Sequence, residues 1–409
     1  MSDDIEDEFD KIVEGAPGDI AGDQKAPDDA DLCAWDAGDD DYENIPPRGW
    51  LLGNIFCRKF MSGLIGEGGA GKSSLRLAQI LSVATGRSLT GEHVFCRAPA
   101  LIVGLEDSKD ELRRRIKAAM IHHGISRAEL KGWLFCAAPR GLTLAELRDG
   151  SPAVGKLEAL IRGYVARRNI ALVNFDPFIK THTMEENSNT AIDYVVRLLT
   201  GMATELDIAT DSCHHTRKGI AEAGNAEAGR GASSFKDGGR LIYTTTRMTA
   251  DEAKLFGIGE RERLLYVRHD SGKVNIAPPS SEAKWFKLVG VRLNNGGGLY
   301  PHGDEVQTVE PWEPPDAWEG LSYLKLNEIL TAIDAGLSDG RRYSAHNQAK
   351  ETAAWNVVLE HAPDKPEEQA KLIIKSWIKN KVLVPEEYQN PITHKAAQGL
   401  RVDQSKRPK

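Results

Sequence analysis

Hydrophobic residues follow two different spacings between residues 58 and 290 of this 409-residue chain. Short apolar runs, which predict buried strands, alternate with longer stretches where apolar residues recur every three or four positions and predict helices. This alternation is typical of an α/β fold with a mainly parallel sheet. The predicted strands are residues 59–65, 100–106, 133–137, 170–176 and 208–215, and the predicted helices are residues 71–85, 109–123, 154–168 and 190–205.

The pattern changes after residue 215. A stretch rich in Gly and Ala, up to residue 239, has no apolar period and predicts a mobile loop. Three further strands are predicted at residues 240–248, 263–269 and 284–293. Four prolines, at positions 301, 311, 314 and 315, then predict a linker over residues 301–320.

Residues 321–409 predict a small C-terminal α+β domain of winged-helix type. Helices are expected near residues 324–335, 350–362 and 367–380, and a hairpin is expected between residues 382–384 and 400–402. The third helix carries Lys371, Lys375 and Lys379 at four-residue spacing. These lysines form either a DNA-facing surface or an ordinary solvated face, and the spacing alone does not choose between the two.

Charge is distributed unevenly along the chain, although the net charge is only −8. Residues 1–44 hold 17 acidic and two basic residues, a net charge of −15, whereas residues 45–409 have a net charge of +7. Such an acidic, apolar-poor segment predicts a disordered tail over residues 1–45, ahead of a core over residues 46–300. The tail is a solubilising segment, a phosphate mimic or a docking arm for a partner.

Several classes of protein are excluded by composition. No apolar run approaches the ~20 residues of a membrane helix, and the N-terminal sequence lacks the basic and apolar regions of a signal peptide. The five cysteines are odd in number and form no CxxC pair. We therefore expect a cytoplasmic protein without disulfides.

The strongest motif is GEGGAGKS at residues 66–73, a complete phosphate-binding G-x-x-x-x-G-K-[ST] loop. A predicted strand precedes the motif and an amphipathic helix follows it, as such a loop requires. In this loop Lys72 neutralises the β- and γ-phosphates of ATP, and Ser73 holds Mg²⁺. The residues predicted to contact the nucleotide are Gly66, Gly68, Gly69, Ala70, Gly71, Lys72, Ser73 and Ser74.

Two carboxylates complete this predicted site. Asp176 ends an apolar strand about a hundred residues after Lys72, which is the position of a second Mg²⁺ ligand, although a helix cap ahead of Pro177 is the alternative. Glu106 ends another strand and is favoured as the residue that activates water. Asp107 is its competitor, either for that role or as a helix cap.

These parts, in this order, resemble the RepA-type hexameric replicative helicases of the RecA-like and DnaB-like P-loop ATPases. The similarity covers about residues 58–290. The matching segments are GEGGAGKSS at 66–74, ALIVGLED at 100–107, LVNFDPF at 172–178, MEENSN at 184–189, CHHTRKG at 213–219, GRGASSFKDGGRLIYTTTRMT at 229–249 and LLYVRHDSGKVN at 264–275.

The resemblance implies roles for individual residues. Glu106 matches the catalytic carboxylate and Asp176 the Walker B acid of that family. His215, or its neighbour His214, matches the sensor at the end of its strand; a metal site with Cys213 is the alternative. Arg240 matches the arginine finger that reaches the nucleotide of the next subunit, with Arg230 and Arg268 as fallbacks. Residues expected to contact DNA are Arg217, Lys218, Arg230 and Lys236.

The expected function is therefore an ATP-dependent, ring-forming DNA helicase of plasmid, phage or mobile-element replication. It would use ATP and Mg²⁺ and act on single-stranded DNA as a homo-oligomer, a hexameric ring. Replication or loader proteins are its expected partners. The alternatives are a RecA-like DNA-dependent ATPase of recombination or defence, and a nucleotide-gated DNA-binding regulator.

The sequence departs from the family pattern in one strand. Asp211 and Ser212 lie in a strand that is apolar in such helicases, and burying polar groups there without partners is costly.

Overall fold

The computed structural model describes residues 34–408, apart from residues 186–187, 217–223, 226–231, 279 and 281. Its backbone contacts divide the chain into two units, Met1–Pro47 and Arg48–Lys409. In the first unit, the described residues 34–47 are exposed throughout and contain one short 3-10 helix, Tyr42–Asn44. The predicted site residues all belong to the second unit.

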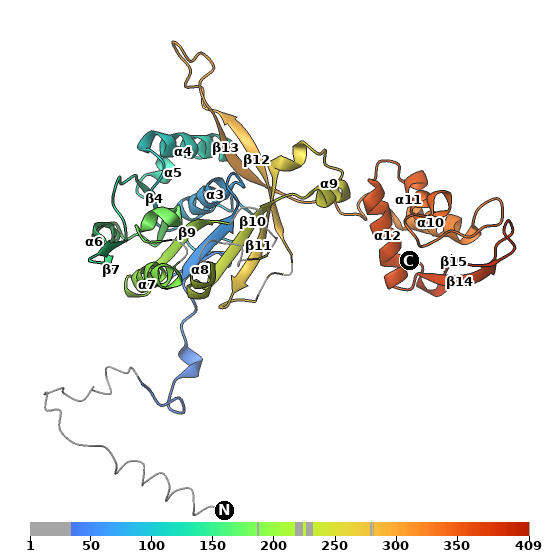
Figure 1. Cartoon of the computed structure of the whole chain (residues 1–409), viewed down its shortest axis with the longest axis horizontal. Coiled ribbons are helices and arrows are strands. Elements are labelled where there is room, and N and C mark those ends of the chain that lie inside the picture. The colour runs from blue at the N-terminus through green and yellow to red at the C-terminus, as the bar shows by residue number, and fades with distance from the viewer. Residues whose placement is uncertain are drawn as a thin grey trace, which may run out of the picture. The chain divides into compact units, whose positions relative to one another are not determined.

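A nine-stranded sheet forms the centre of the second unit (Figure 1). Its order is β13-β12-β11-β10-β3-β9-β8-β4-β5; the strands from β10 to β5 are parallel, and β10 to β13 pair antiparallel. The strands are β3 (Met61–Gly66), β4 (Ala100–Gly104), β5 (Leu134–Ala137), β8 (Leu172–Asp176), β9 (Ala209–His215), β10 (Leu241–Arg247), β11 (Tyr266–Val274), β12 (Lys284–Arg292) and β13 (Glu305–Trp312). The fold is thus mixed α/β with a mostly parallel sheet, as the sequence predicts.

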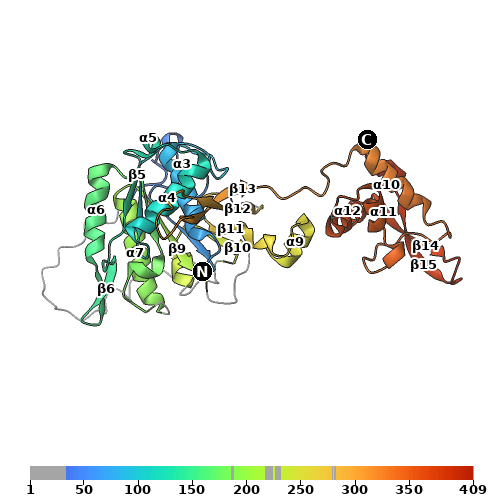
Figure 2. The same cartoon turned by 90° about the horizontal axis from the view of Figure 1, so that it is seen from above.

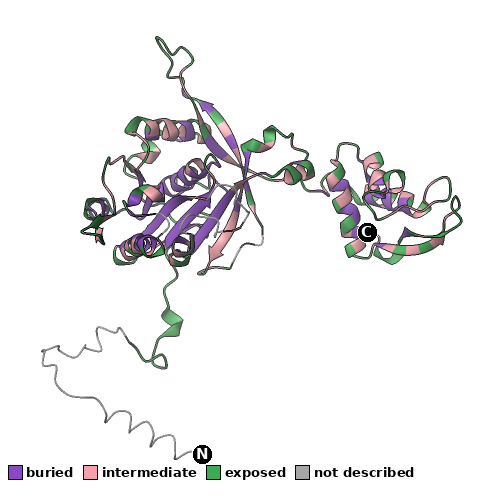
Figure 3. Ribbon diagram, in the orientation of Figure 1, coloured by how far each residue is buried: buried purple, intermediate pink, exposed green. Residues whose placement is uncertain are grey.

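Helices cover both faces of this sheet (Figures 1 and 2). They are α3 (Lys72–Thr85), α4 (Lys109–His123), α5 (Arg127–Leu130), α6 (Lys156–Arg168), α7 (Asn189–Glu205) and α8 (Ala232–Gly238). A further helix, α9 (Ala250–Phe256), follows β10 and packs in a separate small cluster with Tyr266 and Trp285. Because side chains alternate along a strand, β3 sends Leu64 into a core with α3 and α4, and sends Ile65 into a second core with α6 and α7. The burial pattern in Figure 3 follows these two cores.

The predicted strands and helices of the region 59–215 all exist, and their ends agree within two residues. The ends of helix α4 could be predicted because capping residues mark them. The Ser108 side chain accepts a hydrogen bond from the Glu111 backbone at the first end, and Gly124 takes the left-handed conformation at the other. Two short pairs of strands were not predicted, β1 (Trp50–Leu52) with β2 (Phe56–Cys57), and β6 (Ala145–Arg148) with β7 (Ser151–Val154).

Two predictions are wrong in the second half of the chain. Residues 305–312, expected within a proline-rich linker, form β13 at the edge of the sheet, where the missing N–H of Pro311 is tolerated. Residues 232–238, expected within a mobile loop, form α8. Phe235 anchors this helix because its ring is fully buried, 4.7 Å from Phe178 and 5.0 Å from His214.

The C-terminal region has a hydrophobic core of its own. It contains α10 (Tyr323–Ala335), α11 (Trp355–His361), α12 (Glu367–Lys379) and a hairpin of β14 (Leu383–Gln389) and β15 (Ala396–Val402). The three helices and the hairpin were predicted, whereas the winged-helix assignment stays a prediction. The lysine row on α12 is uneven, since Lys371 pairs with Glu367 and Glu368 while Lys375 and Lys379 are exposed.

Among the described helices, none combines the length and the apolar composition that crossing a lipid bilayer requires.

Candidate nucleotide site

The loop between β3 and α3 has a backbone that only glycine fits at two positions. A Cβ at Gly66 would lie 2.5 Å from the carbonyl oxygen of Thr245. Gly71 has φ +74° as the N-cap of α3, and a Cβ there would lie 2.7 Å from Leu288. Gly68 has open space beside it and Ala70 is buried. The loop therefore keeps its N–H groups close to the space in front of α3, as phosphate binding requires.

Lys72 is buried at the start of α3 with its ammonium group facing this loop. Its Nζ donates hydrogen bonds to the carbonyl oxygens of Gly66 at 2.8 Å and Glu67 at 2.7 Å, and lies 3.3 Å from Nδ1 of His215. Burial lowers the pKa of Lys72, and the nearby carboxylates of Asp176 and Glu67 oppose that effect. The ammonium group is thus held at the loop by groups that a bound phosphate can replace.

Ser73 and Asp176 meet at the carboxyl end of β8. The Ser73 hydroxyl hydrogen-bonds the Asp176 carboxylate, and the pKa of Asp176 is raised by burial, with Ser73, Arg115 and Lys72 acting in the opposite direction. A hydroxyl and a carboxylate are the hard oxygen ligands that Mg²⁺ accepts beside substrate phosphates. The predicted pair of Mg²⁺ ligands is therefore adjacent in the fold.

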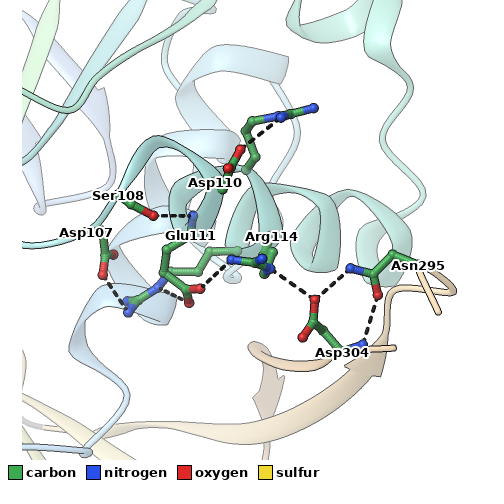
Figure 4. Close-up of polar contacts among 9 residues, drawn as sticks. Asp107, Ser108, Asp110, Glu111, Arg114, Asn295 and Asp304 are labelled. Carbon is green, nitrogen blue, oxygen red and sulfur yellow. Dashed lines mark hydrogen bonds and ion pairs between the residues drawn. The ribbon is translucent and has the colours of Figure 1, made fainter. Parts of the chain in front are cut away.

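Glu106 and Asp107 follow β4 but differ in their surroundings. Asp107 lies 3.1 Å from Arg115, which also pairs with Glu111 at 3.4 Å (Figure 4). Burial raises the pKa of Asp107, and the charge of Arg115 opposes this. Glu106 is exposed and has no ion pair in the part of the chain that the structure describes. The geometry therefore favours Glu106 as the carboxylate that is available to a water molecule.

Replacing Glu106 by glutamine is expected to lower ATP hydrolysis by about 10²–10³-fold, because the amide cannot accept a proton from water. Affinity for ATP is expected to stay close to that of the wild type. Phosphate release and binding of a fluorescent ATP analogue measure the two effects. Asp107→Asn is the matched control, and a larger loss of hydrolysis in that variant would exchange the roles of the two carboxylates.

His214 and His215 point to opposite faces of β9. His215 lies beside Lys72 in the cavity described below, whereas His214 is buried among the rings of Phe178 and Phe235. Cys213 is buried on the same face as His215, and burial raises the pKa of its thiol. In the described part of the chain, no three His, Cys, Asp or Glu side chains group in a way that suits a metal ion. Of the two histidines, His215 is the one placed at the nucleotide site.

These side chains enclose a polar cavity of about 330 Å³. Its lining residues are Gly69, Gly71, Lys72, Ser73, Ser74, Glu106, Asp107, Arg115, Asp176, Pro177, His215 and Gln307. The predicted residues from the phosphate loop, β4, β8 and β9 thus converge, as the carboxyl ends of parallel strands do in an open α/β sheet.

Three residues that lie at this site were not predicted from the sequence. Gln307 comes from β13, inside the expected linker, and its carbonyl oxygen accepts a hydrogen bond from Ser74 at 3.3 Å. Arg247 ends β10, and its guanidinium donates to the carbonyl oxygen of Gly69 at 3.0 Å. Arg115 was detectable by its helical spacing from Glu111, and Arg247 by its place at a strand end. Gln307 had no local signal.

A cluster of polar contacts joins α4 to the segment between β12 and β13, the strand that carries Gln307 (Figure 4). Arg114 donates to Asp304 at 3.0 Å, and Asn295 donates to the same carboxylate at 2.6 Å. These two contacts hold the pKa of Asp304 below its usual value, with the Asn295 hydrogen bond as the larger cause. These contacts connect the antiparallel strands β12 and β13 to α4, the helix that carries Arg115.

The remaining predicted residues lie away from this cavity. Arg240 is exposed just before the amino end of β10. The phosphate loop lies at the other end of these parallel strands, where they have their carboxyl ends. Lys236 is half-buried on α8 rather than in a loop. Arg268 is held by Glu252 at 2.7 Å and Asp270 at 3.0 Å. The predicted DNA contacts Arg217, Lys218 and Arg230 fall outside the described residues.

Residues 26–221 match the family model described as an AAA domain. The matched segment contains the phosphate loop and, at the ends of three other strands, Glu106, Asp176 and His215. It ends before Arg240 and before the C-terminal region. The match and the cavity together support a nucleotide-binding ATPase-type function for this chain, with Mg²⁺ as the usual companion of the nucleotide.

Proposed function

We propose that this protein is an ATP-dependent DNA helicase that works as a ring of identical subunits, with ATP hydrolysed between neighbours. The ATPase part rests on the AAA domain match and on the cavity around Lys72. The helicase part rests on the resemblance of residues 58–290 to RepA-type replicative helicases, which extends past the matched domain to Arg240. Replication of a plasmid, phage or other mobile element is the setting that this resemblance favours.

The observation that carries the ring is the position of Arg240. The β10–β3 register places Leu241 beside Ser62 and Thr245 beside Gly66, so Arg240 precedes the phosphate loop by about 13 Å or more along the strands. Its side chain cannot serve the nucleotide of its own chain from there. An arginine that is exposed at this edge suits the nucleotide of an adjacent copy, where it would stabilise charge in the transition state.

Single-stranded DNA is the proposed substrate of the ring. Affinity without sequence preference comes mainly from basic groups that contact phosphates, and residues 45–409 have a net charge of +7. The proposed contacts Arg217, Lys218 and Arg230 lie between His215, at the cavity, and α8, which Phe235 anchors to the sheet. Loader or replication proteins are the proposed further partners.

Mixing two inactive variants tests the shared site. Arg240→Ala and Glu106→Ala subunits are each expected to be inactive alone. After random mixing in a ring, about one interface in four combines an intact Glu106 with an intact Arg240, so hydrolysis is expected to return to a comparable fraction. Absence of recovery in rings shown to contain both subunits would refute a shared site.

A strand-displacement assay tests the helicase itself. Forked DNA is expected to be unwound with ATP and Mg²⁺ while blunt duplex is not, and mass measurement of the assembly is expected to give a ring, with six subunits favoured. Hydrolysis stimulated by single strands without unwinding would favour the ATPase of recombination or defence. Tight, sequence-dependent duplex binding by the full chain would favour the nucleotide-gated regulator.

A further inference from the structure

A single buried carboxylate joins four elements of the fold directly beneath the nucleotide cavity. Asp211, in the middle of β9, is fully buried. Its Oδ1 accepts a hydrogen bond from Ser62 on β3 at 2.8 Å and lies 3.1 Å from the guanidinium of Arg76 on α3. Its Oδ2 accepts a hydrogen bond from Asn174 on β8 at 2.7 Å. The polar residues that looked out of place in two buried strands are therefore partners of each other.

Each member of this network belongs to an element that supplies the site. Arg76 lies one helical turn after Lys72 and Ser73 on α3. Asn174 precedes Asp176 on the same face of β8, and Asp211 precedes His215 on the same face of β9. The network therefore forms a layer under the cavity, with Cys213 between the two.

Stability alone does not account for such a network. Well-packed apolar residues replace buried ion pairs in many proteins without loss of stability. This network is also incompletely paired, since Arg76 Nε, Arg76 Nη2 and Gln79 Nε2 are buried and have no hydrogen-bond partner among the described residues. The contact of Arg76 Nη2 with Asp211 is therefore an ion pair without hydrogen-bond geometry. The contacts of Asp211 do something that apolar packing cannot do, because the ion pair with Arg76 ties α3 to β9 and the hydrogen bond from Asn174 ties β8 to β9.

We infer that Arg76, Asn174 and Asp211 are positioning residues for Mg²⁺ and nucleotide. They hold α3 in one register, so that the Ser73 hydroxyl meets the Asp176 carboxylate and Lys72 faces His215. The inference deepens the proposed function and rests on its ATPase part. A displacement of reacting groups by about 1 Å can cost on the order of 100-fold in rate, so small movements of α3 are sufficient to impair the site.

The test replaces the network by apolar side chains. The variant combines Arg76→Met, Gln79→Met, Asn174→Val and Asp211→Val, while Ser62 keeps the carbonyl oxygen of Thr210 as an acceptor at 3.3 Å. We expect it to unfold at a denaturant concentration close to that of the wild type. Its kcat is expected to fall by about 10- to 100-fold, and its half-saturating Mg²⁺ concentration to rise by about 10-fold.

A milder variant, Asp211→Asn, keeps the shape, removes the charge and turns one acceptor oxygen into an NH2 donor. It is expected to shift kcat and the Mg²⁺ dependence in the same direction in folded protein, which keeps the test valid if the apolar variant does not fold. The exposed pair Asp193 and Arg197 provides the control, because Asp193→Asn with Arg197→Met also removes an ion pair but lies outside the cavity lining. The control is expected to behave like the wild type.

Binding of a fluorescent ATP analogue, with and without Mg²⁺, separates this inference from the proposed function. Wild-type affinity is expected to rise with Mg²⁺, and that gain is expected to shrink in both network variants. Folded variants with kcat and Mg²⁺ dependence within about twofold of the wild type would overturn the inference alone. Wild-type protein that neither hydrolyses ATP nor binds it with Mg²⁺ would overturn the proposed function, and the inference with it.

Discussion

Replacing Lys72 by methionine is expected to reduce ATP hydrolysis by at least about 10²–10³-fold. The methionine keeps the apolar stem, which is buried at 5% exposure, and removes only the ammonium group. That group is held at the phosphate loop by the carbonyl oxygens of Gly66 and Glu67, where it would neutralise the charge on the β- and γ-phosphates. Phosphate release at saturating ATP and Mg²⁺ measures the effect.

Lys254→Met is the matched control for this variant. The Lys254 side chain is 68% exposed on α9 and is not part of the cavity. Its replacement is expected to leave hydrolysis unchanged. If Lys72→Met protein retained wild-type hydrolysis, the assignment of the phosphate loop would have to be abandoned.

Replacing Asp211 by alanine is expected to lower the free energy of unfolding by about 3–5 kcal/mol. The reason is that Arg76, only 1% exposed, would keep its charge in the core without a carboxylate. Asn174 would lose its acceptor at the same time. Urea unfolding followed by tryptophan fluorescence and circular dichroism measures the change.

Asp193→Ala provides the comparison, because it also removes a carboxylate that is paired with an arginine. Asp193 pairs with Arg197 at 2.5 Å, but its side chain is 44% exposed. Its loss is expected to cost no more than about 0.5 kcal/mol. Equal effects of the two substitutions would contradict the buried network around Asp211.

Most of the phosphate site could be predicted because each of its parts is recognisable from a short stretch of sequence. The loop at residues 66–73 is continuous in sequence, Glu106 and Asp176 each end an apolar run, and His215 ends a predicted strand. In a parallel sheet those ends meet at one edge, so predicting the strands also predicts the convergence of these side chains. The cavity then distinguishes Glu106 from Asp107, because Arg115 holds only the latter.

The positions of Gln307 and Arg240, in contrast, could not be predicted from the local sequence. Gln307 reaches the cavity because β13 pairs with β12, a contact between distant segments that no local period records. The position of Arg240, at the end of the parallel strands away from the phosphate loop, follows only from the register of β10 with β3. Proline content misled the prediction of residues 301–320, since an edge strand accepts a proline that a central strand would not.

The sequence by itself determined the α/β class, the boundaries of the core helices and strands, and the phosphate loop. These follow from side-chain periodicity and from glycine and capping residues, which act over a few neighbouring positions. Only the tertiary structure decided which buried polar groups are paired. Asp211 appeared costly along its own strand, yet its partners come from β3, β8 and α3. The free energy of a buried charge depends on its neighbours in space, and the chain order does not record those neighbours.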